Sequence, residues 1–238
     1  MKKISRRQFV KGSIAAMATI TVAGTKSSGQ VRGANEIIRV AVAGLNGRGS
    51  AHVGGYLGIP NVEINYLVDP DTRTYNRRLE QFGERAAPYL IKDIRRALED
   101  RNVDAVSIAT PNHWHALMTI WAAQAGKHVY VEKPSSHNVR EGRITVEIAR
   151  RHNVIVQHGT QSRSETSWRN TIAAIQSGRY GRLLVSRGLC YKIRNSIGTR
   201  PVGNPPSEID FDLWLGPAQR TGFHTNLVHY NWHWFWDF

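Results

Sequence analysis

The chain has 238 residues, of which 41% are hydrophobic and 21% charged, and this composition favours a folded globular protein over a disordered chain. The formal net charge is +14, a value compatible with nucleic-acid binding. No helix-turn-helix, zinc-finger or basic-helix pattern accompanies the charge, so we expect no nucleic-acid partner.

The basic residues are concentrated at the N-terminus. The stretch Ser5–Lys11, "SRRQFVK", places paired arginines before the uncharged stretch Gly12–Thr25, which is too short and too weakly apolar to span a bilayer. This pattern resembles a twin-arginine export signal; a basic arm or a poor amphipathic helix is the alternative. We expect residues 1–34 to be signal and linker, the export machinery to be a partner, and the protein to be periplasmic or otherwise extracytoplasmic without a permanent membrane anchor.

From Ile37 onward, short runs rich in valine and isoleucine alternate with amphipathic stretches. The predicted strands are Ile37–Ala43, Val62–Val68, Pro88–Ile91, Val103–Ala109, His128–Val131 and Val154–Gln157. The predicted helices are Ser50–Leu57, Thr72–Phe82, Ile94–Asp100, His113–Ala125 and Arg140–Arg151, with Asp93 as an N-cap and Gly126 as a C-terminal stop. This alternation predicts an α/β fold, a doubly wound parallel sheet of the Rossmann type over residues 35–158.

The pattern changes in residues 159–238, which we expect to begin a second domain. A helix is predicted at Trp168–Gln176, a strand at Leu183–Lys192 and a loop-rich stretch at Asn195–Pro217. The tail Tyr230–Phe238 is rich in tryptophan. Aromatic faces stack on sugars, but a tryptophan-rich strand more often belongs to a core.

The first predicted strand runs into a glycine-containing turn, "AGLNGRGSAH". Gly44 suits a tight turn and Gly49 suits close packing of the next helix on the sheet, while free N–H groups at that helix start can hold a pyrophosphate. In the dinucleotide-binding pattern G-x-G-x-x-G, the second glycine position is occupied here by Asn46. Asparagine tolerates a positive φ better than most residues, and Gly47 follows it directly. These residues, together with Arg48, are candidate cofactor contacts. The alternative is an ordinary strand-to-helix turn.

The second predicted strand ends in Asp69, twenty residues after Gly49. An acid at about this offset accepts hydrogen bonds from an adenosine ribose, and it repels a 2′-phosphate, which favours NAD over NADP. Arg73 lies nearby in the sequence, and as a cation it attracts a 2′-phosphate and so opposes the preference for NAD. The alternative for Asp69 is a turn residue before Pro70.

Polar residues also follow the fourth and fifth predicted strands. The further cofactor candidates are Thr110, Asn112, His113, His115, Glu132 and Lys133. The segments "GLNGRG", "TPNHWHA", "GKHVYVEKP" and "GTQSRS" occur in an order that resembles the Gfo/Idh/MocA family (glucose-fructose oxidoreductase, inositol dehydrogenase and rhizopine-catabolism proteins), in its exported form.

The resemblance implies that Lys133, in Glu-Lys-Pro, is the proton-transfer residue. Independently, oxidation of an alcohol needs a base, and a lysine becomes usable when a neighbouring cation or partial burial lowers its pKa. We expect Pro134 to hold the preceding peptide bond in cis and Glu132 to orient a neighbour. The alternative is a surface turn with a local ion pair.

Substrate contacts are predicted in the second domain, at its start and in the tryptophan-rich tail: Gln161, Arg163, Ser164, Trp232 and His233. No metal site is predicted. His113 and His115 diverge on a helix, and His229 and His233 have zinc-like spacing without a cysteine or carboxylate motif.

The resemblance implies an NAD(P)-dependent oxidoreductase that acts on a sugar, a cyclitol or a related polyol. The export signal favours a cofactor that is trapped before export, and we therefore expect it to be tightly bound. The alternatives are an NAD-assisted glycoside hydrolase or lyase, and a non-catalytic sugar or dinucleotide sensor. Family members continue into a mostly antiparallel sheet and often form homo-oligomers, so we expect residues 159–238 to be only the beginning of an α+β substrate and oligomerisation domain. The chain is therefore expected to be truncated at its C-terminus.

Overall fold

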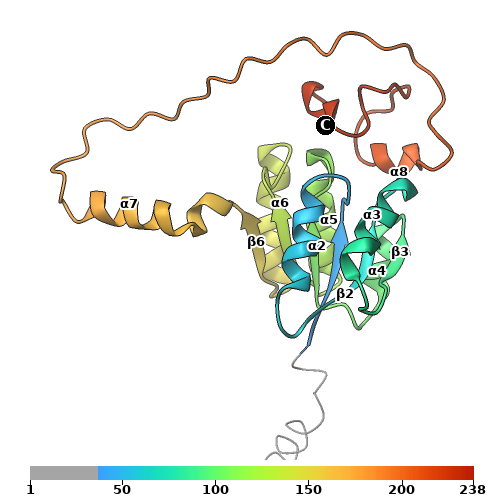
Figure 1. Ribbon diagram of the computed structural model, residues 1–238, viewed down its shortest axis with the longest axis horizontal. Coiled ribbons are helices and arrows are strands. Elements are labelled where there is room, and N and C mark those ends of the chain that lie inside the picture. Colours follow the sequence, from blue (N-terminus) through green and yellow to red (C-terminus); the bar gives the residue numbers. More distant parts are fainter. Residues whose placement is uncertain (1–36) are drawn as a thin grey trace, which may run out of the picture.

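The structure is a computed structural model that describes residues 37–238. The predicted export signal and linker, residues 1–34, lie outside the described residues. At the centre is a parallel sheet of six strands (Figure 1). The strands are β1 (Ile38–Ala43), β2 (Val62–Val68), β3 (Tyr89–Ile91), β4 (Ala105–Ile108), β5 (His128–Glu132) and β6 (Val156–Gly159).

The strand order is β3-β2-β1-β4-β5-β6, and every neighbouring pair is parallel. The sheet is therefore built outward from β1 in one direction and from β4 in the other, which confirms the predicted doubly wound Rossmann fold. The order reverses between β1 and β4, and ligands bind at the carboxyl ends of the strands at such a point. All six predicted strands are present.

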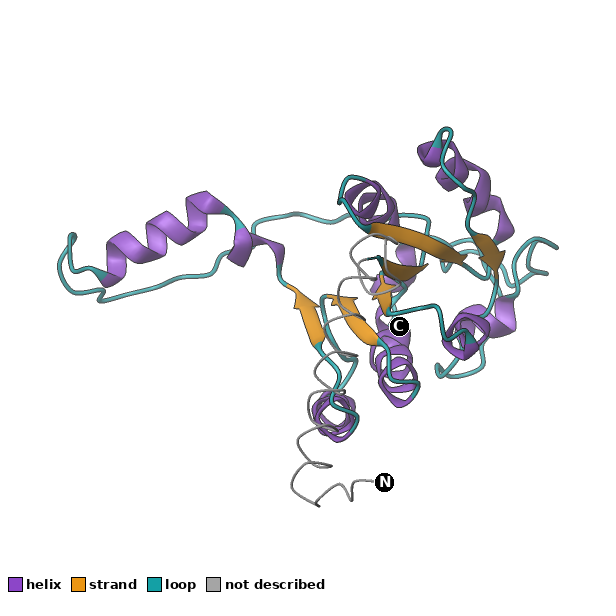
Figure 2. Ribbon diagram, turned by 90° about the horizontal axis from the view of Figure 1, so that it is seen from below, coloured by secondary structure: helices purple, strands orange, loops and turns teal. Residues whose placement is uncertain are grey.

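The helices that connect the strands lie on both faces of the sheet (Figure 2). They are α2 (Arg48–Leu57), α3 (Tyr75–Leu79), α4 (Ile94–Glu99), α5 (Asn112–Gln124) and α6 (Val139–Arg151). Successive side chains of a strand point to opposite faces. Val40 and Val42 of β1 thus join the core formed with α2 and α3, whereas Ala41 and Ala43 join the core formed with α4 and α5.

Two helix-end predictions are confirmed and one helix differs. Oδ1 of Asp93 accepts a hydrogen bond of 2.9 Å from the backbone of Arg95 at the start of α4, and Gly126 has a φ of +73° just after α5. The predicted helix Thr72–Phe82 forms as a 3₁₀ turn (Thr72–Thr74), then α3, then a second 3₁₀ turn (Glu80–Phe82).

Beyond β6 the chain leaves the sheet. A 3₁₀ turn, η3 (Gln161–Ser164), and the predicted helix, α7 (Thr166–Gln176), are followed by an extended stretch, then by α8 (Phe211–Leu215) and a 3₁₀ turn, η4 (Asn231–Trp234). The strand predicted at Leu183–Lys192 is wrong, because this stretch has no strand beside it in residues 37–238 and a strand needs a hydrogen-bonding neighbour. The expected antiparallel sheet is likewise not formed among the described residues, where residues 160–238 contribute only isolated bridges. None of the described helices combines the length and apolar character needed to cross a bilayer.

Candidate active site

The turn between β1 and α2 requires its two predicted glycines. Gly44 has a φ of +84°, and a Cβ there would lie 2.5 Å from the carbonyl carbon of Ala109 and from the nitrogen of Thr110. A Cβ on Gly49 would lie 1.8 Å from the carbonyl oxygen of Gly44. Because neither space admits a side chain, the tight turn and the close approach of α2 to the sheet are both confirmed.

The N-terminal end of α2 is exposed to solvent. Asn46, Gly47 and Arg48 are exposed, and Gly47 caps the helix without a side-chain hydrogen bond from any described residue. The first N–H groups of α2 are therefore free to hold an anion. Asn46 is not among the described non-glycine residues with positive φ, so the conformational reason predicted for asparagine at this position is wrong: the turn takes its left-handed step at Gly44.

A buried arginine, which the sequence did not reveal, holds this turn in place. Arg78 is 4% exposed, and its Nε donates a hydrogen bond of 2.8 Å to the carbonyl oxygen of Leu45. Its Nη1 donates to the hydroxyl of Ser50. Arginine is rarely buried, but one arginine on a helix carries no sequence pattern that distinguishes it from a surface arginine.

Asp69 lies at the end of β2, facing the turn. Its Oδ2 accepts a hydrogen bond of 2.8 Å from the backbone N–H of Leu45, and its Oδ1 accepts one of 2.9 Å from that of Asp71. Burial raises the pKa of Asp69 to about 6, although these two backbone hydrogen bonds act to lower it. The carboxylate is thus held against the glycine turn by two backbone N–H groups, and its contact with a ribose stays a prediction.

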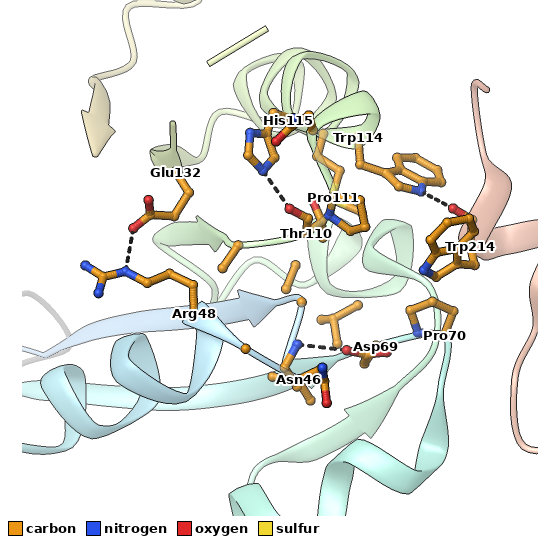
Figure 3. Close-up of a pocket in the computed structure, with 18 of the residues that line it drawn as sticks. Asn46, Arg48, Asp69, Pro70, Thr110, Pro111, Trp114, His115, Glu132 and Trp214 are labelled. Atoms are coloured by element: carbon orange, nitrogen blue, oxygen red, sulfur yellow. Dashed lines mark hydrogen bonds and ion pairs between the residues drawn. The ribbon is translucent and has the colours of Figure 1, made fainter. Parts of the chain in front are cut away.

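Glu132 is the centre of a buried polar network at the end of β5. Its Oε1 accepts from Nε of Arg48 at 2.9 Å and from Nε2 of Gln161 at 2.5 Å, and lies 3.0 Å from Nε2 of His52. Figure 3 shows the pairing with Arg48. Burial acts to raise the pKa of Glu132, but hydrogen bonds from these three side chains outweigh it and lower the pKa to about 2. The predicted orienting role of Glu132 thus has three identified partners, of which His52 was missed.

Lys133 follows immediately and is exposed. The Lys133–Pro134 peptide bond is cis, as predicted. The carbonyl oxygen of Pro134 lies 2.6 Å from Nδ1 of His115, whose Nε2 lies 2.8 Å from the carbonyl oxygen of Thr110 (Figure 3). Burial lowers the pKa of His115. This histidine therefore ties the Glu-Lys-Pro turn to the end of β4.

These groups surround one cavity of about 500 Å³ along the carboxyl ends of the strands, a volume in the range typical of small-molecule sites. The predicted site residues that line it are Gly44, Asn46, Gly47, Arg48, Asp69, Thr110, Asn112, His115, Glu132, Lys133, Gln161 and Trp232. The cofactor loop and the candidate base therefore share one space.

Five predicted residues do not line this cavity. Gly49 packs beneath it, and Arg163 and Ser164 lie exposed on η3. His233 contacts the carbonyl oxygen of Tyr230.

His113 is buried against α8, with Nε2 3.0 Å from the carbonyl oxygen of Trp214. Burial lowers the pKa of His113 to about 4. Its other ring nitrogen, Nδ1, has no hydrogen-bond partner within residues 37–238. His113 therefore packs α5 against the C-terminal part of the chain.

His229 and His233, which have zinc-like spacing, contact different groups. His229 contacts Asp71 and His233 contacts a backbone oxygen. Nowhere in residues 37–238 do three potential metal ligands come together.

The cavity fits a dinucleotide on three independent features. A Cβ on Gly47 would meet nothing within 4 Å, so a ligand has room to approach the backbone there, and the uncapped start of α2 offers N–H groups to phosphate oxygens. The hydroxyl of Thr110, which also lines the cavity, is buried and has no hydrogen-bond partner among the described residues. A ligand with hydroxyl or amide groups supplies that partner.

A sheet wound in both directions, a glycine turn at its switch point and a cavity along its carboxyl edge define a dinucleotide-binding Rossmann protein. Residues 38–160 match the Gfo/Idh/MocA family, described as "Oxidoreductase family, NAD-binding Rossmann fold". The chain belongs to this oxidoreductase family, as its four sequence segments predicted.

Two relatives show how far the similarity reaches. The scyllo-inositol 2-dehydrogenase (NAD(+)) of Bacillus subtilis is 30% identical over 173 residues, which are 72% of this chain and 47% of the relative. A glycosyl hydrolase family 109 protein of Saccharopolyspora erythraea is 27% identical over 209 residues, which are 77% of this chain and 45% of the relative. The chain thus spans about half the length of the curated relatives it matches.

Solved structures agree with the fold. The apo scyllo-inositol dehydrogenase of Lactobacillus casei has a TM-score of 0.57 at 22% identity, over 61% of this chain and 43% of that one. The WlbA dehydrogenase of Bordetella pertussis, solved in complex with NADH and UDP-GlcNAcA, has a TM-score of 0.55 at 26% identity, over 61% and 44% of the two chains.

Proposed function

We propose that the protein is a nicotinamide-dinucleotide-dependent oxidoreductase that acts on a CH–OH group of a sugar, a cyclitol or a related polyol. The observation that carries this proposal is the single cavity lined both by the glycine turn and by Lys133. A bound dinucleotide supplies hydride transfer at its nicotinamide ring. The relatives named as inositol and sugar-nucleotide dehydrogenases support the substrate class.

The residues of the chain have separate tasks in this reaction. Lys133 takes the proton of the substrate hydroxyl as a general base. Glu132, held ionised by its three partners, fixes Gln161 beside the cavity by accepting from its Nε2. The amide oxygen of Gln161 is then available to accept a hydrogen bond from a sugar hydroxyl.

We propose further that the cofactor is NAD and that it is held tightly. The buried carboxylate of Asp69 repels a 2′-phosphate when ionised. Arg73, the cation that opposes this preference, is engaged elsewhere: its Nη2 and Nε donate to Oδ2 of Asp71 at 2.6 and 3.1 Å. A guanidinium group in this arrangement is not free to pair with a phosphate.

Substitution of Lys133 tests the assignment of the base. Lys133→Met is expected to bind NADH like the wild type but to lose reduction of NAD by scyllo-inositol and a panel of hexoses by at least about 100-fold. Lys133→Arg, which keeps the charge but is a far weaker base, is the matched control and is expected to lose activity as well. Full activity in either variant contradicts the role given to Lys133.

A second function is favoured by relatives named as glycosidases, including an alpha-N-acetylgalactosaminidase of Shewanella oneidensis that is 30% identical over 59% of this chain and 36% of that protein. In this reading the residues that line the cavity would hold a dinucleotide that supplies transient oxidation of the sugar, with no net change in the cofactor. A chromogenic aryl N-acetylgalactosaminide distinguishes the two functions. Release of the aryl alcohol without net NADH accumulation supports the glycosidase, whereas NADH accumulation with free polyols supports the dehydrogenase.

We propose export by the twin-arginine route on the basis of the sequence Ser5–Lys11. A reporter fused behind residues 1–34 is expected in the periplasm of a bacterial host. Replacement of both Arg6 and Arg7 by lysine is expected to retain it in the cytoplasm. An unchanged distribution contradicts the export proposal and leaves the enzymatic one intact.

A further inference from the structure

Residues 206–238, which we call the cover segment, lie outside the part of the chain that matches the family, yet they lie over the carboxyl edge of the sheet. Figure 1 shows this stretch with α8 above the ends of the strands. The segment has a small core of its own, in which Trp214, Leu215, Leu227 and Phe238 are each at most 5% exposed. It is therefore a packed element with defined contacts to the Rossmann domain.

The cover segment is attached to the end of β2 at two places. Ile209 forms an antiparallel bridge with Asp71, and the backbone N–H of Asp210 donates to the carbonyl oxygen of Pro70 at 2.9 Å. Nε2 of His229 lies 2.6 Å from Oδ2 of Asp71. The Asp71 side chain is fully buried, so loss of the His229 contact leaves a buried carboxylate with fewer donors, which is costly.

A further attachment is made at the start of α5. The indole N–H of Trp114 donates to the carbonyl oxygen of Trp214 at 3.0 Å (Figure 3), and Nε2 of His113 lies 3.0 Å from the same oxygen. The cover segment is thus fixed to both halves of the sheet, on either side of the cavity mouth.

Side chains of the cover segment are part of the cavity wall. Trp214, His229 and Tyr230 line the same cavity as Asp69 and Pro70, and Figure 3 shows Trp214 on the side of the cavity where Pro70 lies. In a Rossmann fold the end of the second strand contacts the adenosine ribose. Aromatic faces at this position are able to stack on a purine base.

We infer that the cover segment forms the outer wall of the adenosine half of the dinucleotide site, with Tyr230 as the aromatic contact and the Asp71–His229 pair holding the wall in place. The inference rests on the proposed function, since it requires a dinucleotide in the cavity. It assigns part of the cofactor site to residues beyond the Rossmann domain. Adenosine monophosphate, which carries the adenosine half alone, is therefore the diagnostic ligand.

Tyr230 offers the cleaner test because it is 69% exposed, so that its truncation disturbs little packing. Tyr230→Ala is expected to raise the dissociation constant of NADH about tenfold, the typical effect of losing one base–aromatic stack. Adenosine monophosphate, measured by competition against NADH, is expected to weaken by the same factor. Nicotinamide mononucleotide is expected to compete unchanged, and Tyr230→Phe, which keeps the ring, is expected to bind like the wild type.

The rate of NADH release tests the role of the Asp71–His229 pair. His229→Leu is expected to release NADH about tenfold faster in stopped flow, whereas His229→Gln, which retains an N–H donor toward Asp71, is expected to recover most of the wild-type rate. His152→Leu, at an exposed position on the end of α6, is the matched control. Circular dichroism identifies any variant that fails to fold.

The outcomes separate the two proposals. If the wild type binds NADH, but folded Tyr230→Ala and His229→Leu bind and release it at wild-type values, the cover segment is no part of the site and the inference is wrong. If Tyr230→Ala weakens nicotinamide mononucleotide instead of adenosine monophosphate, the assignment to the adenosine half is wrong. If the folded wild type binds no dinucleotide, the proposed function itself fails.

Discussion

Nε2 of His52 lies 3.0 Å from Oε1 of Glu132, and both side chains are buried. His52 belongs to α2, which begins at the glycine turn, and Glu132 ends β5 directly before Lys133. The other ring nitrogen of His52 lies 2.8 Å from the hydroxyl of Ser107 on β4. One histidine thus connects the helix that starts at the cofactor turn to the strand that delivers the candidate base.

Glu132→Gln tests this network. The change keeps the shape but removes the charge, and it is expected to destabilise the fold at pH 7 by about 2 kcal/mol, because charge-assisted hydrogen bonds to buried groups are lost. The folded pKa of about 2 lies below the ordinary value of 4.5, so the stabilisation is complete above pH 4.5 and is lost as the pH falls toward 2. Urea unfolding of wild type and variant between pH 3 and pH 7 measures this difference. Glu147→Gln, at an exposed position on α6, is the control, and an equal loss in both variants contradicts the network.

Gly49→Ala tests the close contact between α2 and the sheet. The added Cβ would lie 1.8 Å from the carbonyl oxygen of Gly44, so the helix start must move, at an expected cost of about 1 to 3 kcal/mol. NADH affinity is expected to fall at least about tenfold, because the N–H groups of α2 move with it. Gly47→Ala meets nothing within 4 Å and is expected to keep its stability. Denaturant unfolding and NADH fluorescence titration check both variants. If Gly49→Ala is as stable as Gly47→Ala, the close contact between α2 and the sheet is contradicted.

His113→Gln tests the burial of a histidine under the cover segment. The folded pKa of about 4 lies below the ordinary 6.5, so the unfolded chain binds the proton first and stability falls as the pH drops from 6.5 to 4. This contribution amounts to about 3 kcal/mol. The glutamine variant lacks this titration, so its stability is expected to fall less than that of the wild type between pH 7 and pH 4.5 in urea unfolding. Parallel losses in the two proteins contradict the assignment.

Asp69→Asn tests the basis of cofactor preference. Removal of the carboxylate removes repulsion of a 2′-phosphate, so the ratio of NADPH to NADH affinity is expected to rise about tenfold. Arg73→Ala is a matched control, because the Arg73 guanidinium is engaged with Asp71. Fluorescence titration with NADH and NADPH measures both affinities. A large drop in NADPH affinity in Arg73→Ala contradicts the view that the Arg73 guanidinium is unavailable to a 2′-phosphate.

The parallel sheet was predictable because its strands are marked by short apolar runs in the sequence, and those of β1, β2, β4 and β5 contain buried residues. The Glu-Lys-Pro turn and the glycine turn were likewise predictable, because parallel strands bring their carboxyl ends to one edge. The Leu183–Lys192 stretch has the composition of a strand, but composition does not provide a neighbouring strand.

Contacts between distant parts of the chain were not predictable. The side chains of Asp71 and His229 meet across 158 residues of sequence, and neither residue belongs to a recognisable pattern. The role of His52 was not predictable either, because it depends on contacts of α2 with Ser107 of β4 and Glu132 of β5. The zinc-like spacing of His229 and His233 led to no predicted site, and only the fold shows that His229 faces the end of β2.

Tryptophan fluorescence during an NADH titration tests the central claim most directly, because Trp114, Trp214 and Trp232 line the cavity. The account predicts saturable quenching in the folded protein, with energy transfer to NADH at one site per chain, and a midpoint shifted to at least about tenfold higher NADH concentration in Gly49→Ala. A folded wild-type protein that shows no saturable signal, or a Gly49→Ala variant that binds with wild-type affinity, would contradict it.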